Sequence, residues 1–336
     1  MSVFKKSRQI KLIVFCLAIF WSSVLYSQKV KQASKDLASK PIHHLSKDQA
    51  EVSPNSISGS EMSFSQISEN EFEISLVKYF YCMADMIDSI ETVSIYESLA
   101  TMMTSQPQLH LNSIKDSTLI VNANCPNFKK LCVKKATYIG RLKLMMPMIG
   151  GYDVTWGHCC WNENSIRNIE GLLESKKQGL GLVLHIPQIG IAESNSSPVF
   201  QSLPILSACK GQLLSISNTA YDKDNDSLSY EFSQLFDYKA GNDIKYKDEP
   251  MVEPGKPMNK SFAGPRPPFK KIVYRKEFTP SNPVKSKLIS INYKNGEMQL
   301  KPDTIGEFLL GISVNEFRNS KQLGAYQRVY KIKVTD

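Results

Sequence analysis

The sequence predicts an all-β protein built from two β-sandwich domains in tandem. Three observations support this fold class: apolar and polar residues alternate in many short segments, turn signals separate these segments, and few stretches have helical periodicity. The chain has 336 residues, of which 42% are hydrophobic and 22% charged. This composition is typical of globular proteins and argues against disordered, collagen-like or polytopic membrane proteins. The length allows two domains that each bury a core.

Residues 1–27 are predicted to be a signal peptide. Basic residues precede an apolar run at 12–21, and small residues follow it as far as Ser27. The run is about half of the ~20 residues that a membrane-spanning helix needs, so we expect cleavage and no transmembrane segment afterwards. The alternative is an uncleaved anchor. The protein is therefore expected to be exported to the cell envelope, the outer surface or the medium.

A flexible linker is predicted at 28–56, because this stretch is rich in Ser, Lys and Gln and has scarcely any aromatic residues. The N-terminal domain follows at 57–192, where alternation with period two indicates half-buried strands. These strands are predicted at 71–79, around Val93 and Ile95, at 138–144 and at 152–156. The segment 85–104 has a second interpretation as an amphipathic helix, since part of its apolar residues follow helical spacing.

The C-terminal domain is predicted at 193–336 and has the clearer strand pattern. Asn295-Gly296 lies between alternating apolar residues, which predicts a hairpin over 288–300. Further strands are predicted at 308–314 and 330–334.

Six cysteines remain after removal of the signal peptide: Cys82, Cys125, Cys132, Cys159, Cys160 and Cys209. Export makes disulfide bonds their default fate, and six cysteines allow 15 complete pairings. A bond between the neighbours Cys159 and Cys160 would force an abnormal peptide geometry, so we expect each to bind a different, distant cysteine. Cys125 and Cys132 could close a short loop, and Cys209 could join the two halves of the protein by binding one of the vicinal pair.

The strongest candidate for a binding site is the segment Asp222-Lys223-Asp224-Asn225-Asp226. Carboxylates at alternate positions in a turn can converge on one hard cation, and Ca²⁺ takes 6 to 8 oxygen ligands. The alternative is a solvated hairpin turn in which the aspartates cap backbone amides. We therefore predict a calcium site and no other cofactor.

Enzyme signatures are missing from the sequence, which has no P-loop, no dinucleotide-binding fingerprint, no His-Glu-x-x-His and no Gly-x-Ser-x-Gly. His158-Cys159-Cys160 has three interpretations: a thiol nucleophile, a zinc site or disulfide-bonded cysteines. The last is favoured, because zinc sites usually show Cys-x-x-Cys pairs. Trp156 and Trp161 flank these cysteines and are interpreted as packing on a disulfide, with sugar binding as the alternative.

Nine segments of the chain carry a resemblance to a known family: 57–64, 67–82, 152–162 (YDVTWGHCCWN), 166–169, 195–200 (NSSPVF), 220–230 (AYDKDNDSLSY), 295–302, 306–308 and 314–319 (VNEFRN). In this order they resemble the repeating extracellular region of large secreted proteins of Bacteroidota, often labelled gliding-motility-associated or adhesin-like. The second half is similar to PKD-like and cadherin-like modules. The resemblance implies an Ig-type sandwich, so the complete prediction is two Ig-like β-sandwich domains in tandem after a signal peptide and a linker.

The same resemblance implies a ligand set for calcium. Cadherin-like relatives suggest this use for Asp222, Asp224 and Asp226, with Glu316 as an extra ligand. Two positions depart from the family's usual pattern, since Trp161 stands where Arg is usual and Asn225 stands where the acidic turn usually has Gly. Asn can still adopt the left-handed conformation of such a turn.

The expected function is that of a non-catalytic structural or adhesive module at the bacterial cell envelope or surface. The alternatives are a carbohydrate-binding protein and a polysaccharide hydrolase built from scattered carboxylates, which would leave no spacing signature. The expected partner is an envelope protein or a glycan. A nucleic acid is not expected despite the net charge of +9, because the basic residues do not gather in one stretch beside stacking aromatic residues.

Overall fold

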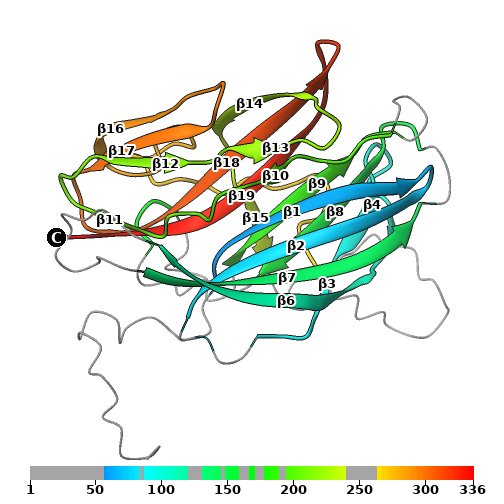
Figure 1. The fold of residues 1–336 in the computed structure, drawn as a ribbon, viewed down its shortest axis with the longest axis horizontal. Coiled ribbons are helices and arrows are strands. Elements are labelled where there is room, and N and C mark those ends of the chain that lie inside the picture. The colour runs from blue at the N-terminus through cyan, green and yellow to red at the C-terminus, as the bar shows by residue number, and fades with distance from the viewer. Residues whose placement is uncertain are drawn as a thin grey trace, which may run out of the picture. The chain divides into compact units, whose positions relative to one another are not determined.

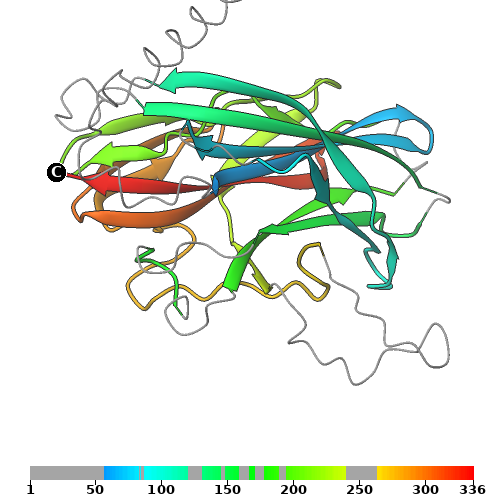
Figure 2. The same ribbon diagram turned by 90° about the horizontal axis from the view of Figure 1, so that it is seen from below.

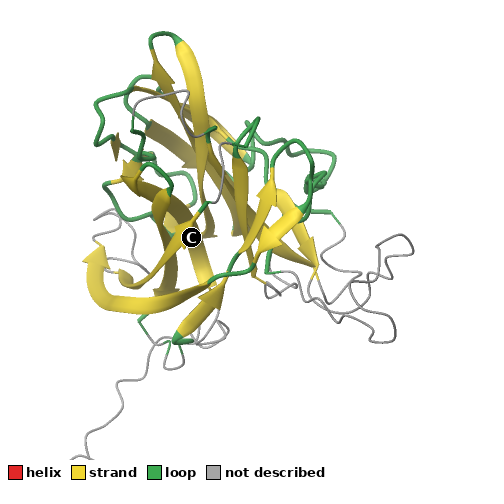
Figure 3. Ribbon diagram, turned by 90° about the vertical axis from the view of Figure 1, so that its right-hand side faces the viewer, coloured by secondary structure: helices red, strands yellow, loops and turns green. Residues whose placement is uncertain are grey.

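The computed structural model describes residues 57–82, 84, 87–119, 131–144, 148–158, 166–170, 178–188, 194–239 and 263–336. In this part of the chain every regular element is a β-strand (Figure 3). The all-β prediction is therefore confirmed.

The largest sheet has nine strands and runs through the whole described structure (Figure 1). In order across the sheet they are β14 (Ser227–Phe232), β18 (Gly306–Arg318), β19 (Lys321–Thr335), β1 (Ile57–Ser68), β2 (Glu71–Tyr81), β7 (Leu131–Lys143), β6 (Gln108–Leu119) and β3 (Ile90–Thr92). The ninth strand, β11 (Ser207–Cys209), pairs in parallel with the end of β19.

Three smaller sheets complete the described fold. The five-stranded sheet has the order β15 (Phe236–Lys239), β9 (Gln178–Ile186), β8 (Tyr152–His158), β4 (Ser94–Glu97) and β5 (Met103–Ser105). The three-stranded sheet has the order β12 (Leu214–Ser217), β17 (Glu297–Pro302) and β16 (Ser286–Ile291). A two-stranded sheet joins β10 (Val199–Phe200) to β13 (Ala220–Tyr221).

Two hydrophobic cores lie on opposite faces of the large sheet. The first core packs β2 and β1 against β8 and β9 of the five-stranded sheet, which lies on one side of the large sheet (Figure 2). The second core packs β18 and β19 against β12 and β17. Along β18, Leu309 belongs to the first core, whereas Phe308 and Leu310 belong to the second. This strand is buried on both faces because side chains alternate across a strand.

Strands from both sides of the expected domain boundary at 192/193 share sheets. β1 pairs with β19, with Gly59 opposite Tyr330, and β15 pairs with β9. A Cβ atom at Gly59 would lie 2.8 Å from the Tyr330 Cβ, so only glycine allows this close approach. Both cores contain residues from each side of this boundary, and Ser53–Asp336 forms one compact unit.

The hairpins of the C-terminal half have turn residues in the left-handed conformation. β16 and β17 form the predicted hairpin, and Gly296 has a φ of 71° in the connecting loop. β18 and β19 form a longer hairpin whose two turn residues, Asn319 and Ser320, have φ values of 51° and 63°. Two left-handed residues suit the twist of a two-residue hairpin turn.

The helical interpretation of 85–104 is wrong. The described part of this segment contains β3, β4 and the start of β5 instead of a helix. Leu99, which the helical spacing would have buried, is 70% exposed, whereas Val93 and Ile95 are buried in the first core. Burial here follows the period of two, because the segment pairs with β6 and β8.

Candidate metal centre

The loop between β13 and β14 carries the three aspartates of the predicted calcium site. Asp222 Oδ1 accepts hydrogen bonds from the backbone N–H groups of Asp224 (2.9 Å) and Asp226 (2.8 Å). Asn225 has a φ of 63°, the left-handed conformation expected where the turn usually has Gly. Asp222 therefore caps backbone amides, as the alternative interpretation of the segment expected, but it does so with one oxygen only.

The second oxygen of Asp222, Oδ2, accepts no hydrogen bond from the described residues. One ligand atom from each of Asp222, Asp224 and Asp226 lies within 4.8 Å of the others. Asp222 is only 6% exposed, and its Oδ2 has no hydrogen-bond partner among the described residues. A buried carboxylate oxygen costs free energy unless a hydrogen bond or a cation compensates it. Asp222 Oδ2 is therefore suited to bind a cation.

Glu316 lies on β18, and its side chain is fully buried. Its Oε2 accepts hydrogen bonds from the Tyr326 hydroxyl (2.8 Å) and from Asn195 Nδ2 (3.3 Å), whereas its Oε1 has no partner among the residues described. Burial raises the pKa of Glu316 to about 8; the two hydrogen bonds oppose this shift, and the negative charges of Asp222 and Asp226 add to it. Burial also raises the pKa of Asp222.

Arg318 is the positive charge in direct contact with the acidic cluster. Its Nε donates to Asp226 Oδ1 (2.8 Å), and its Nη2 donates to Asp226 Oδ2 (2.6 Å) and to Asn195 Oδ1 (2.8 Å). No local sequence pattern predicts this contact, because Arg318 and Asp226 lie 92 positions apart. The guanidinium thus hydrogen-bonds to the carboxylate of Asp226, and the charges of Asp224 and Glu316 also act on it.

The cluster also contacts β1, the first strand of the described structure. The backbone N–H of Ser196 donates to Asp224 Oδ2 (2.6 Å), and the backbone N–H of Asn195 donates to Gln66 Oε1 (2.9 Å) on β1. The backbone N–H of Gln66 in turn donates to Ser196 Oγ (3.3 Å). The acidic cluster therefore lies where β1, the segment before β10, the 222–226 loop and the end of β18 come together.

These donors fit a hard cation. All of them are oxygens, which Ca²⁺ prefers, and two buried carboxylate oxygens, Asp222 Oδ2 and Glu316 Oε1, are without a partner within the described structure. Glu316 adjoins the three aspartates but is not one of the group within 4.8 Å. The sequence thus identified acidic residues that the fold brings together, and it missed Arg318 and Asn195.

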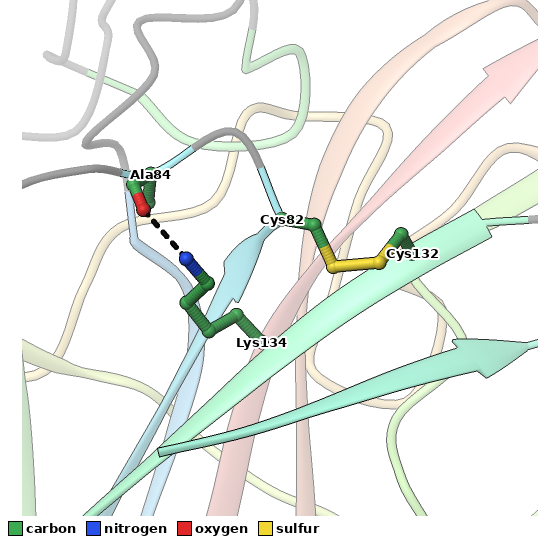
Figure 4. The surroundings of a disulfide bond; sticks show 4 residues. All are labelled: Cys82, Ala84, Cys132 and Lys134. Atoms are coloured by element: carbon green, nitrogen blue, oxygen red, sulfur yellow. Dashed lines mark hydrogen bonds between the residues drawn. A yellow bond between two sulfur atoms is a disulfide. The ribbon is translucent and has the colours of Figure 1, made fainter. Parts of the chain in front are cut away.

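The disulfide bond between Cys82 and Cys132 joins the residue after β2 to β7 (Figure 4). Next to it Lys134 Nζ donates to the backbone oxygen of Ala84 (2.8 Å). The suggested pairing of Cys125 with Cys132 is therefore wrong, because β7 lies beside β2 and brings Cys132 to Cys82.

Cys209 is also disulfide-bonded. The remaining cysteines after residue 27, Cys125, Cys159 and Cys160, lie outside the described residues. Their predicted pairings stay predictions.

Trp156 is not a sugar-binding platform. Its side chain is 2% exposed in the first core, and its Nε1 donates to Glu91 Oε2 (2.8 Å). Glu91 also forms an ion pair with Lys78, which is 3% exposed. His158 stacks on Trp156, with 6.1 Å between ring centroids, and burial and the nearby charge of Lys78 lower its pKa to about 4. Trp161 lies outside the described residues.

Two further polar clusters were not expected from the sequence. Ser98 Oγ (3.4 Å) and Asp153 Oδ1 (2.9 Å) both contact Nδ1 of His185. A catalytic triad needs the nucleophile on one ring nitrogen and the acid on the other, so this arrangement does not form one. The second cluster is a buried ion pair between Glu61 and Arg328.

No protein-family model, curated protein or solved structure matches the chain. Within the described ranges, no helix is long and apolar enough to cross a membrane.

Proposed function

We propose that the chain is an exported, non-catalytic structural or adhesive module of the bacterial cell envelope and that it binds Ca²⁺ at Asp222, Asp224, Asp226 and Glu316. One observation carries the calcium site: Asp222 Oδ2 and Glu316 Oε1 are buried carboxylate oxygens without a partner among the residues described. A divalent cation would compensate both at once. Waters could satisfy them singly but would not neutralise the excess of acids over the one guanidinium in contact.

The envelope location rests on separate observations. The N-terminal residues have the basic, apolar and small-residue order of a signal peptide. The Cys82–Cys132 disulfide is typical of proteins in an oxidising compartment. The resemblance to extracellular regions of Bacteroidota proteins supports a structural or adhesive role, and a large antiparallel sheet is a suitable scaffold for it.

Thermal unfolding tests the calcium site. The purified protein is treated with chelator and then unfolded in chelator, in CaCl₂ or in MgCl₂. At a Ca²⁺ concentration of 100 Kd, binding would stabilise the folded state by about 2.7 kcal/mol. This corresponds to an increase in Tm of roughly 4–5 °C for a unit of this size. Mg²⁺ should have a smaller effect, because it demands octahedral geometry and keeps its waters.

Two matched variants locate the effect. Asp222→Asn removes a carboxylate oxygen from the cluster and should abolish the Ca²⁺-dependent shift in Tm. Asp116→Asn makes the same chemical change at an exposed position on β6 and should leave the shift intact. Identical unfolding curves of the unmodified protein in chelator and in CaCl₂ would exclude the calcium site.

The location is tested by fractionating cells that express the full chain. The protein is expected in the envelope fraction or the medium, with residues 1–27 removed from the mature form. Recovery of the full-length chain in the cytoplasm alone would contradict the envelope role. If the protein is found in the envelope fraction, pull-down from that fraction would identify its partner.

A further inference from the structure

Arg318 lies at the edge of the acidic cluster, at the end of β18. It is the last residue of β18 and lies opposite Lys321, the first residue of β19, across the turn Asn319-Ser320. Its side chain is 21% exposed, whereas that of Asp226 is 4% exposed. The hairpin therefore delivers a permanently charged guanidinium to a buried carboxylate.

The contacts of Arg318 use oxygens that a bound cation would need. The guanidinium engages both oxygens of Asp226 in a bidentate fork and also binds Asn195 Oδ1. Bidentate pairs of this kind are among the strongest hydrogen-bonded ion pairs. Both oxygens of Asp226 thus accept hydrogen bonds from the guanidinium of Arg318.

Arg318 hydrogen-bonds to Asp226 and leaves two other carboxylate oxygens of the cluster without a partner in the described structure. Asp222 Oδ2 and Glu316 Oε1 are still without partners in the described structure, so the arginine compensates part of the acidic charge and leaves the rest. We propose that Arg318 is a built-in competitor of Ca²⁺: it holds Asp226 and stabilises the ion-free fold, and ion binding takes Asp226 out of the arginine fork. This inference rests on the calcium site proposed above.

Competition follows from charge and from ligand number. A guanidinium beside a divalent cation repels it, and this repulsion is strong where burial keeps the effective dielectric constant low. Ca²⁺ also needs 6 to 8 oxygens, and a cluster of four carboxylates cannot leave one of them fully engaged elsewhere without losing affinity. Arg318 therefore lowers the affinity for Ca²⁺ while it raises the stability of the ion-free protein.

Substitution of Arg318 separates the two effects. Arg318→Gln removes the charge, so it should lower the Tm in chelator and at the same time tighten Ca²⁺ binding about tenfold, as measured by isothermal titration calorimetry. Arg318→Lys keeps the charge but loses the fork, so it should tighten binding by a smaller factor, roughly two- to threefold. An arginine with a purely structural role would lower the Tm and weaken Ca²⁺ binding together.

Arg141→Gln is the matched control. Arg141 also binds a carboxylate, that of Glu73 (3.2 Å), but on an exposed part of β2 and β7. Its substitution should leave the Kd for Ca²⁺ unchanged.

The possible results distinguish the two proposals. Suppose that the unmodified protein binds Ca²⁺ and that Arg318→Gln weakens this binding or leaves it unchanged. This result would overturn the proposed role of Arg318 but not the calcium site. If Arg318→Gln does not fold in chelator, Arg318→Lys decides, because an unchanged or weaker affinity in that variant would also overturn the role. No binding by the unmodified protein or by either variant would overturn the site itself.

Discussion

The buried charges of this protein are of two kinds. In one kind, cations and anions are paired one to one: Lys78 with Glu91, Arg328 with Glu61 and Lys331 with Glu307 all lie at least partly buried in the described sheets. In the other kind, the cluster around Asp222 and Glu316, four carboxylates lie near one arginine, Arg318, which forms its ion pair with Asp226.

The two kinds differ in charge balance and not in unpartnered atoms, since Nη1 and Nη2 of Arg328 also lack a hydrogen-bond partner among the described residues. Glu61 has a matched cation and also accepts a hydrogen bond from the Tyr79 hydroxyl (3.0 Å). Glu316, in contrast, has one oxygen with no partner among the described residues, and its pKa is raised. Removal of an acid should therefore have opposite consequences in the two settings, and the following predictions test that contrast.

The largest effect is expected at the matched pair. Glu61→Gln would leave the guanidinium of Arg328, which is 0% exposed, without a counter-charge, and should cost about 3–5 kcal/mol of unfolding free energy. Glu316→Gln in chelator should be neutral or stabilising, because it removes an uncompensated buried acid. Urea denaturation of both variants measures the contrast. Equal destabilisation by the two substitutions would contradict the distinction.

The disulfide should matter next. Replacing Cys82 and Cys132 by Ala opens a loop with a sequence separation of 50 and should cost about 2–4 kcal/mol. The bond lies between β2 and β7, whereas the acidic cluster lies beyond β1 at the end of β18. The Ca²⁺-dependent gain in stability should therefore survive in the double variant, measured as the difference between CaCl₂ and chelator.

Acidification should lower the unfolding free energy of the protein through protonation of His158. Its folded-state pKa is about 4, below the ordinary value of 6.5, so the unfolded state binds the proton more readily. The stability that His158 contributes is present above pH 6.5 and is lost as the pH falls towards 4, by about 1–3 kcal/mol. His158→Gln should flatten this part of the pH profile of unfolding.

The ion-free acidic cluster should respond with the opposite sign. The pKa of Glu316 is raised from 4.5 to about 8, so its contribution is present below pH 4.5 and is lost as the pH rises through 8. The slope is at most about 1.4 kcal/mol per pH unit. In chelator, Glu316→Gln should remove this loss. A profile that is the same in the variant and in the unmodified protein would show that Glu316 is not the responsible group.

The smallest effect is expected at the exposed pair Arg141–Glu73. Arg141 is 63% exposed, and exposed ion pairs contribute about 0–1 kcal/mol. Arg141→Gln should therefore change the unfolding free energy by less than about 1 kcal/mol. A loss comparable to that of Glu61→Gln would mean that burial is not what separates these pairs.

The strands were largely predictable, and their partners were not. Period-two alternation located the strands at 152–156 and 330–334, and Asn295-Gly296 located a hairpin, because these signals depend on neighbouring residues. The pairing of β1 with β19 joins residues at opposite ends of the described chain, and no local pattern reports it. The continuous apolar run at 308–310 was the available clue that β18 is buried on both faces.

The residues of the candidate site also differ in whether the sequence could identify them. The spacing of Asp222, Asp224 and Asp226 identified three of its acids, and the family resemblance added Glu316. Arg318 escaped detection because its place beside Asp226 depends on the register of the β18–β19 hairpin and on the pairing of β14 with β18. Trp156 was given a surface alternative that its position on the inner face of β8 excludes.

The central claim is that the acidic cluster is a cation site, and a crystal structure of the protein grown in millimolar CaCl₂ tests it most directly. The account predicts one Ca²⁺ bound to Asp222 Oδ2 and Glu316 Oε1 at about 2.3–2.6 Å, with Arg318 moved away from Asp226. Crystals with only water at these oxygens and with the Arg318–Asp226 fork intact would contradict it.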